Sequence, residues 1–378
     1  MDRIFIQIAS YRDVELPKTI SSALANADKP ERLRFGICWQ YDETTLDDLD
    51  QYLPDERFRI AQYFYEDSRG CCWARHQTNI LYHGEEYTLQ IDAHTRFSPD
   101  WDTRFIRMLS DLPADKPLLS TYPAPWDIED GKAVLKTDRG IQKLTLSKIR
   151  KDLTTVFKTV PVMDSAHCAR SLFIGAGQIF THGAFCLDVE YDPKLYYLGE
   201  EISISARAYT HGYDFFCPKY DLIWHQYKHK MRTHSADHKS TLQAKSLARL
   251  KTLLLGDHET LGKYGLGARR SLKEYETFTG ISFAECASRS ATPIHFNRTI
   301  RLDPAQIDDR TDYDFWIFTL RNTDDEEIYR HDIYDEAILS KRLLQIQVNE
   351  QLPDVPTSFM IWPHVKDGGF LAQNFHDL

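Results

Sequence analysis

The segment at residues 87–94 reads YTLQIDAH, an apolar β-strand pattern that leads directly into an Asp-x-His pair. Because residues i and i+2 of an extended segment point to the same side, the Asp92 carboxylate and the His94 imidazole can converge on one cation. One oxygen and one nitrogen ligand suit Mn²⁺ or a similar first-row ion better than Mg²⁺ or Ca²⁺, which prefer shells of oxygen atoms. The same pair also arises by chance, as a strand-end Asp that caps a turn beside a surface His. The surrounding elements have to decide between these two interpretations.

Strand-like and helix-like patterns alternate around this segment. Strands are predicted at 4–9, 33–39, 58–65 and 87–91, and helices at 16–27, 46–53 and 72–82. The alternation predicts an α/β domain with a doubly wound parallel sheet. Ligands of such sheets bind beyond the carboxyl ends of the strands, which favours the metal-binding interpretation of Asp92 and His94. The polar residues that follow the first strand are expected at the same edge: Ser10, Tyr11, Arg12 and Asp13.

The texture of the sequence changes toward its end. Residues 228–285 are polar and helix-forming, whereas short strand-like runs divided by turn residues follow Pro293. This change predicts an α/β domain over residues 1–285 and a small β-sandwich-like domain over residues 290–378.

Composition excludes several classes of protein. The 378 residues carry a formal charge of −10, which argues against a surface that neutralises many phosphates of a nucleic acid. No stretch approaches the roughly 18 apolar residues of a membrane span, and the first residues do not resemble a signal peptide. The seven cysteines form no CxxC pair, so neither a disulfide framework nor a zinc ribbon is indicated. We expect a cytoplasmic protein with reduced thiols.

An acidic pair opens a predicted helix at Gly199-Glu200-Glu201-Ile202. Paired acids at this position are commonly partners of the helix dipole, which would account for one of the two. The functional interpretation is that one carboxylate faces a cleft and binds sugar or acceptor hydroxyls. Gly199 permits the close backbone approach that such a pocket needs.

A run of histidines and basic residues follows the apolar stretch that ends at Trp224. His225 is placed to complete a metal shell with Asp92 and His94, and Lys228 and Arg232, with Lys230 between them, are placed to close over phosphates. A separate zinc site is the competing interpretation, although no Cys or carboxylate supports it. The histidines of this competing site would be His225, His229, His234 and His238. The simplest alternative is that His229, His234 and His238 are solvated side chains.

Arg75 lies one turn into the predicted helix that begins after Gly70. A helix N-terminus after glycine favours an anion, so Arg75 can reach a phosphate or a base. From spacing alone, an ordinary surface ion pair is an equal alternative.

Together these segments resemble the nucleotide-sugar-dependent glycosyltransferases of the GT-A fold. The likeness is strongest to the cytoplasmic UDP-GlcNAc transferases that modify hydroxyproline, and to their bacterial relatives. It extends over about residues 3–285 and is carried by IASYRD (8–13), RFGIC (34–38), RG (69–70) with WAR (73–75), QIDAHTRF (90–97), GEEI (199–202) and HGYD (211–214).

The resemblance implies a role for each matching position. Asp92, His94 and His225 would hold Mn²⁺, and the donor diphosphate would bind the metal. Residues 10–13 would hold the uridine, with Arg75, Lys228 and Arg232 also on the donor, and Glu200 or Glu201 would line the sugar and acceptor pocket. The implied reaction moves GlcNAc, or a related sugar, from UDP to a hydroxyl of a protein or glycan, with retention of configuration.

Two other functions are compatible with the sequence. A non-catalytic carbohydrate-binding protein with a degenerate first domain is suggested by aromatic residues near the end of the chain. A metal hydrolase built on the histidine cluster is a weaker idea. The aromatic residues concerned are Trp316, Tyr329, Trp362 and Phe370, for which core packing is the simpler explanation.

Overall fold

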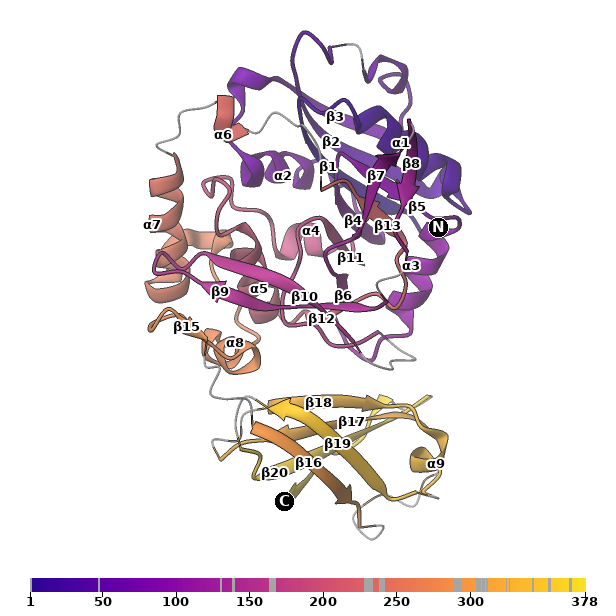
Figure 1. Cartoon of the computed structure of the whole chain (residues 1–378), viewed down its shortest axis with the longest axis vertical. Helices are drawn as coiled ribbons and strands as arrows, with labels where there is room; N and C mark the ends of the chain where they lie inside the picture. Colours follow the sequence, from indigo (N-terminus) through magenta and orange to yellow (C-terminus); the bar gives the residue numbers. More distant parts are fainter. Residues whose placement is uncertain are drawn as a thin grey trace. The chain divides into compact units, whose positions relative to one another are not determined.

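The structure is a computed structural model. It describes residues 2–46, 48–129, 131–137, 140–162, 168–227, 234–237, 242–288, 294–303, 307, 310, 312–323, 325, 327–341, 343–352, 355–366 and 369–378. The chain forms two compact units, Met1–Leu272 and Lys273–Leu378 (Figure 1). A domain boundary at residues 285–290 stays a prediction.

A seven-stranded sheet forms the centre of the first unit, in the order β12-β6-β11-β4-β1-β2-β3. Strand β1 is parallel to β2 and β4, and β2 is parallel to β3, as predicted. Strand β11 runs antiparallel to both of its neighbours, β4 and β6, so the sheet is mixed. The bounds are β1 Ile4–Tyr11, β2 Leu33–Tyr41, β3 Phe58–Phe64, β4 Tyr87–Asp92, β6 Pro117–Ser120, β11 Gln178–His182 and β12 Asp214–Phe216.

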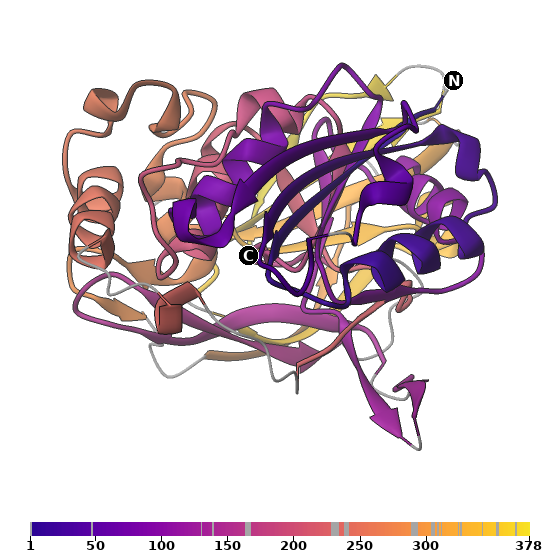
Figure 2. The ribbon, with the colours of Figure 1, turned by 90° about the horizontal axis from the view of Figure 1, so that it is seen from above.

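Helices cover both faces of this sheet (Figure 2). On one face, Ile4, Ile6 and Ile8 of β1 share a core with α1 (Leu16–Asn26) and α3 (Trp101–Ser110). On the other face, Ala9 packs with Trp73 and Ala74 of α2 (Cys71–Asn79). Burial on both sides explains why β1 reads as a nearly continuous apolar run.

A second, smaller sheet lies in the same unit and has the order β5-β13-β7-β8. Its strands are β5 (Thr95–Phe97), β13 (Ile223–His225), β7 (Ala124–Glu129) and β8 (Lys132–Leu135). Strand β13 is antiparallel to β5, with His225 opposite Thr95. This pairing brings a residue from late in the unit next to the end of β4.

The other elements of the described chain include the buried helix α5, the helix α7 and several shorter segments. The helix predicted at 46–53 is reduced to the 3₁₀ turn η2 (Asp50–Tyr52). None of the described helices is long and apolar enough to cross a membrane. The remaining bounds are η1 Pro30–Arg32, η3 Tyr65–Asp67, β9 Gln142–Ile149, β10 Thr155–Pro161, α4 Phe185–Asp188, α5 Glu200–Thr210, α6 His234–Asp237, α7 Leu242–Leu255, η4 His258–Tyr264, α8 Leu272–Thr279, β14 Ile281–Ser282 and β15 Ala287–Ser288.

In the described part of the second unit, two β-sheets share one hydrophobic core. One pairs β16 (Ile294–Arg301) with β19 (Gln345–Leu352), and the other has the order β18-β17-β20-β21 with β22 also on β20; β14 and β15 form a separate short sheet of this unit. Trp316 is fully buried in the shared core and Tyr329 packs against it, so core packing explains both. The other bounds are β17 Tyr313–Arg321, β18 Glu327–Ile333, α9 Glu336–Leu339, β20 Ser358–Val365, β21 Gly369–Phe370 and β22 Asn374–Asp377.

Candidate metal centre and active site

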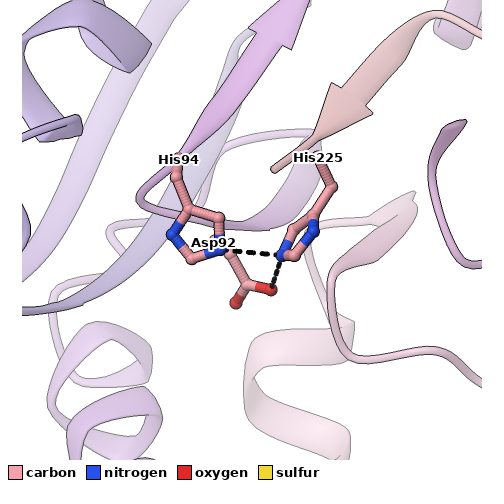
Figure 3. A group of neighbouring side chains, drawn as sticks. All are labelled: Asp92, His94 and His225. Carbon is pink, nitrogen blue, oxygen red and sulfur yellow. Dashed lines mark hydrogen bonds and ion pairs between the residues drawn. The ribbon is translucent and has the colours of Figure 1, made fainter. Parts of the chain in front are cut away.

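Asp92, His94 and His225 converge at one point (Figure 3). The Nε2 atoms of the two imidazoles are 2.8 Å apart, and Nε2 of His225 is 3.1 Å from Oδ2 of Asp92. One ligand atom from each residue lies within 4.8 Å of the other two. One oxygen and two nitrogen atoms of this kind form a donor set suited to a first-row divalent cation.

The fold accounts for this convergence. Asp92 is the last residue of β4, and His94 follows it by two positions in the turn that leads to β5. Because β13 pairs with β5, His225 arrives beside them although it lies 131 residues further along the chain. The carboxyl edge of β4 therefore carries the site, which is where the sequence places it.

The glycine-containing turn before β11 leaves space beside this group. A Cβ atom on Gly177 would lie 3.2 Å from Oδ2 of Asp92 and 4.0 Å from Cδ2 of His225. A side chain there would crowd the ligand atoms, so the glycine keeps that side of the site open. Sequence reasoning missed Gly177; the Gly-Ala-Gly run at residues 175–177 was the available signal.

Asp13 fixes the orientation of the His94 ring. Its Oδ2 lies 2.8 Å from Nδ1 of His94, and its Oδ1 accepts a hydrogen bond of 2.9 Å from the backbone N–H of Glu15. Burial alone would lower the pKa of His94, but the bond to Asp13 and the charges of Asp92 and Asp13 outweigh it and raise that pKa. Because a carboxylate binds Nδ1 of His94, Nε2 faces Asp92 and His225. The same arrangement occurs in metal sites in which a carboxylate supports the ligating histidine.

We expect Asp13→Asn to weaken Mn²⁺ binding by about 10- to 100-fold, the usual effect of losing such a supporting carboxylate. Asparagine keeps an oxygen that can accept from Glu15, so the change removes mainly the charge. Asp55→Asn is the matched control, because Oδ1 of Asp55 also accepts a 2.9 Å bond from the backbone N–H two residues on. Calorimetric titration with Mn²⁺ measures the effect, and equal affinities in the two variants would contradict this role.

Arg75 joins the metal-site carboxylate to the acidic pair of α5. Its Nη2 donates to Oδ1 of Asp92 at 2.9 Å, and its Nε lies 2.7 Å from Oε1 of Glu200. The side chain of Arg75 is 4% exposed, so the surface ion pair considered from the sequence is wrong. Burial alone would raise the pKa of Asp92, but the hydrogen bond with His225 and the charges of Arg75 and both histidines hold that pKa well below its usual range.

Glu201 is held in a separate hydrogen-bonded arrangement. Its Oε2 accepts a 2.6 Å bond from the hydroxyl of Tyr122, and its Oε1 accepts a 3.0 Å bond from the backbone N–H of Ala176. Burial raises the pKa of Glu201 to about 7, aided by the charge of Glu200 and opposed by these two bonds. The two adjacent acids therefore differ in their surroundings: Glu200 is paired with a cation, whereas Glu201 has neutral donors.

This pKa predicts a pH-dependent contribution to stability. Between pH 4.5 and about 7 the unfolded carboxyl ionises while the folded one keeps its proton, so the contribution of Glu201 becomes less favourable as the pH rises. Glu201→Gln should therefore gain stability relative to the wild type across this window, by up to about 3 kcal/mol. Chemical denaturation at pH 4.5, 6 and 8 measures it, with the exposed Glu259→Gln as control. A difference that does not change with pH would refute the shifted pKa.

The loop at residues 10–13 is in contact with α6. The hydroxyl of Tyr11 and Nη1 of Arg12 each donate to Oδ2 of Asp237 at 2.8 Å. Arg12 adopts a positive φ of 50°, pairs with Asp42 at 2.7 Å and lies over the ring of Tyr65. Ser10 is buried at the end of β1. The loop thus leaves the same edge of the sheet as Asp92, because β1 and β4 are parallel neighbours.

Several predicted residues fall outside the part of the chain that the structure describes. These are Lys228, Lys230 and Arg232 of the phosphate-closing segment, with His229 and His238 of the alternative zinc cluster. Of that cluster, His225 joins Asp92 and His94, whereas Nδ1 of His234 is 2.7 Å from the hydroxyl of Tyr196. These contacts favour the mixed carboxylate and histidine site over a separate histidine cluster.

Comparison with solved structures supports the fold. The structure of GalNAc-T7 with UDP, GalNAc and Mn²⁺ matches with a TM-score of 0.55 and 14% identity, over 100% of this chain and 72% of that one. Staphylococcus aureus TarS with UDP-GlcNAc matches with a TM-score of 0.44 and 12% identity, over 74% of this chain and 70% of that one. At these identities the likeness to GalNAc-T7 shows a GT-A-like fold and nothing finer.

Comparison of the sequence itself gives the family. No curated protein matches the sequence. The family model described as Glycosyltransferase (GlcNAc) matches residues 3–56 and 47–285, which include Asp92, His94, His225 and both acids of α5. These matches extend over well more than half of the 378 residues. The chain therefore belongs to the Glycosyltransferase (GlcNAc) family.

Proposed function

We propose that this protein transfers GlcNAc, or a related sugar, from a UDP-sugar to a hydroxyl group of a protein or glycan. The observation that carries the proposal is the convergence of Asp92, His94 and His225 at the carboxyl edge of β4 in a member of this family. At that edge an open sheet of this kind binds its ligand.

The metal in this proposal is Mn²⁺, held by Asp92, His94 and His225. The mixed oxygen and nitrogen donor set favours it over Mg²⁺, and the Mn²⁺ in the GalNAc-T7 structure supports the choice. When bound, the ion supplies positive charge that stabilises a departing diphosphate. Asp13 keeps Nε2 of His94 directed at the site.

The donor contacts follow from the loops around that centre. Ser10, Tyr11, Arg12 and Asp13 would form the side that receives the uridine, with Asp13 acting through His94. Arg75 lies between Asp92 and Glu200 and would orient these carboxylates toward the donor. Lys228 and Arg232 would add positive charge near the phosphates.

Glu200 and Glu201 would contact the sugar and the acceptor. With a pKa near 7, Glu201 is partly protonated at neutral pH and can both donate and accept hydrogen bonds with hydroxyl groups. We infer retention of configuration by a front-side reaction, in which an oxygen of the leaving phosphate takes the acceptor proton. The resemblance to retaining relatives supports this inference.

A panel of UDP-sugars tests the proposal without knowledge of the acceptor. We expect Mn²⁺-dependent release of UDP with UDP-GlcNAc or one closely related donor, and little release with the others. Hydrolysis that is equally fast without divalent metal, or no selectivity among donors, would overturn it. Adding peptides with and without hydroxyproline then tests whether the chain shares the acceptor of the hydroxyproline-directed relatives.

We further propose that the second unit is an accessory β-sandwich domain. Two of its sheets share a core, and Trp362 and Phe370 are half-buried with ring centroids 4.3 Å apart.

A cytoplasmic location is the third part of this proposal. All seven cysteines are free, which supports a reducing compartment.

A further inference from the structure

A cavity of about 410 Å³ opens in the first unit and includes none of the residues of the candidate metal centre. Its volume is within the range of small-molecule sites. The residues that line it come from the segment before α2, the segment before α5 and the helix α7: Arg69, Pro193, Lys194, Leu195, Tyr196, Leu242, Lys245 and Arg249.

The lining of this cavity is strongly cationic. Of the eight described residues that line it, four carry a positive charge and none is acidic, in a chain with a net charge of −10. Arg249 forms an ion pair with Asp192. In the part of the chain that the structure describes, Arg69, Lys194 and Lys245 have no carboxylate within ion-pair distance. Such a concentration of unpaired positive charge attracts anions.

One wall of the cavity is joined to the active site. The backbone N–H of Tyr196 donates to Oγ of Ser246 in α7 at 3.0 Å, and its carbonyl accepts from the N–H of Cys72 in α2 at 3.4 Å. A Cβ on Gly70, the residue before α2, would lie only 2.4 Å from the ring of Tyr196. Helix α2 carries Arg75, and the segment that contains Tyr196 continues directly into α5 and Glu200.

The negative charge of the donor does not explain why this cavity is lined by cations. The negative charge of a UDP-sugar is on its diphosphate, which the proposed function assigns to the metal and to Lys228 and Arg232. The acceptor is the other substrate of the proposed reaction and can supply a second anionic group. We propose that the cavity binds a phosphate group of the acceptor, which makes the acceptor a phosphorylated saccharide; this rests on the proposed function.

Phosphate fits the lining better than a single carboxylate does. Arg69 offers a planar guanidinium group that matches phosphate oxygens, and Lys194 and Lys245 add two further charges, whereas Arg249 is already paired with Asp192. Pro193, Leu195 and Leu242 supply apolar surface beside these cations, which suits the C–H face of an attached sugar ring.

The test uses the full chain and two double variants. Lys194→Ala/Lys245→Ala removes two charges from the cavity, and Lys158→Ala/Lys251→Ala removes two exposed lysines that do not line it. Titration with inorganic phosphate at constant ionic strength should show binding that is about tenfold weaker or more in the cavity variant than in the control. Equal phosphate affinities in the two variants would overturn the site.

Turnover separates acceptor binding from binding of an unrelated anion. Glucose 6-phosphate should raise UDP release from the donor more than glucose does, and the cavity variant should lose this preference. Equal stimulation by both sugars would overturn the assignment to the acceptor. Acceptor-independent hydrolysis should be the same in both variants; its absence from all proteins would instead count against the proposed transferase function.

Discussion

Asp92→Ala should abolish the response of the protein to Mn²⁺ and UDP. The change removes the only carboxylate of the three-residue group and leaves two imidazoles 2.8 Å apart. If the metal stabilises the leaving diphosphate by about 4 kcal/mol, transfer and donor hydrolysis should fall by about a thousandfold. Mn²⁺ and UDP together should raise the melting temperature of the wild type and leave that of the variant unchanged.

Asp188→Ala is the matched control for this experiment. The Asp188 side chain is 32% exposed, against 27% for Asp92, and each forms an ion pair with a basic residue. The control should lose some stability through its contacts with Lys116 and Tyr213, yet keep its full response to metal and nucleotide. Equal stabilisation of Asp92→Ala and the wild type by Mn²⁺ and UDP would refute the metal centre.

Arg75→Met should cost both stability and activity. Methionine fills much of the same space but leaves Asp92 and Glu200 without their shared cation. Removing one partner of a buried ion pair typically costs 3–5 kcal/mol, and we expect about 3 kcal/mol because Asp92 is partly exposed. Chemical denaturation without metal measures this loss.

Mn²⁺ should restore part of this stability, because its charge replaces that of the guanidinium beside Asp92. Donor hydrolysis should nevertheless stay at least about 100-fold below the wild type, since the orientation of Glu200 is lost. Arg59→Met, which breaks the pair with Glu85 elsewhere in the unit, should lose stability without recovering it in Mn²⁺. Identical responses of the two variants to the metal would contradict the position that we assign to Arg75.

The central part of the site could be predicted because it depends on local rules. An apolar strand pattern that ends at Asp92 places His94 two positions further on, at the same strand end, and an apolar run that ends at His225 marks a second strand end. The structure brings these three together, although their role as metal ligands stays a prediction. The first four parallel strands were predictable for the same reason, since each is an apolar run followed by a helical pattern or turn.

Other contacts of the site join residues that are far apart in the sequence, so the spacing of residues along the chain does not reveal them. Asp13 meets His94 across 81 residues, and Tyr122 meets Glu201 across 79, each through the packing of separate loops. Spacing predicts an anion for Arg75, but only the fold shows that its partners are the carboxylates of Asp92 and Glu200. The antiparallel pairing of β11 with β4 and β6 was likewise not predictable from the alternation of strand and helix patterns.

The long separation between His94 and His225 has a consequence for how the protein matures. During synthesis, Asp92 and His94 leave the ribosome well before β13, so a growing chain that lacks β13 has only two of the three candidate metal ligands. The β13–β5 pairing that completes the group also requires the sheet to have formed. High affinity for Mn²⁺ should therefore appear late, together with the folded first unit, so that incomplete chains compete weakly for the metal and cannot consume the donor.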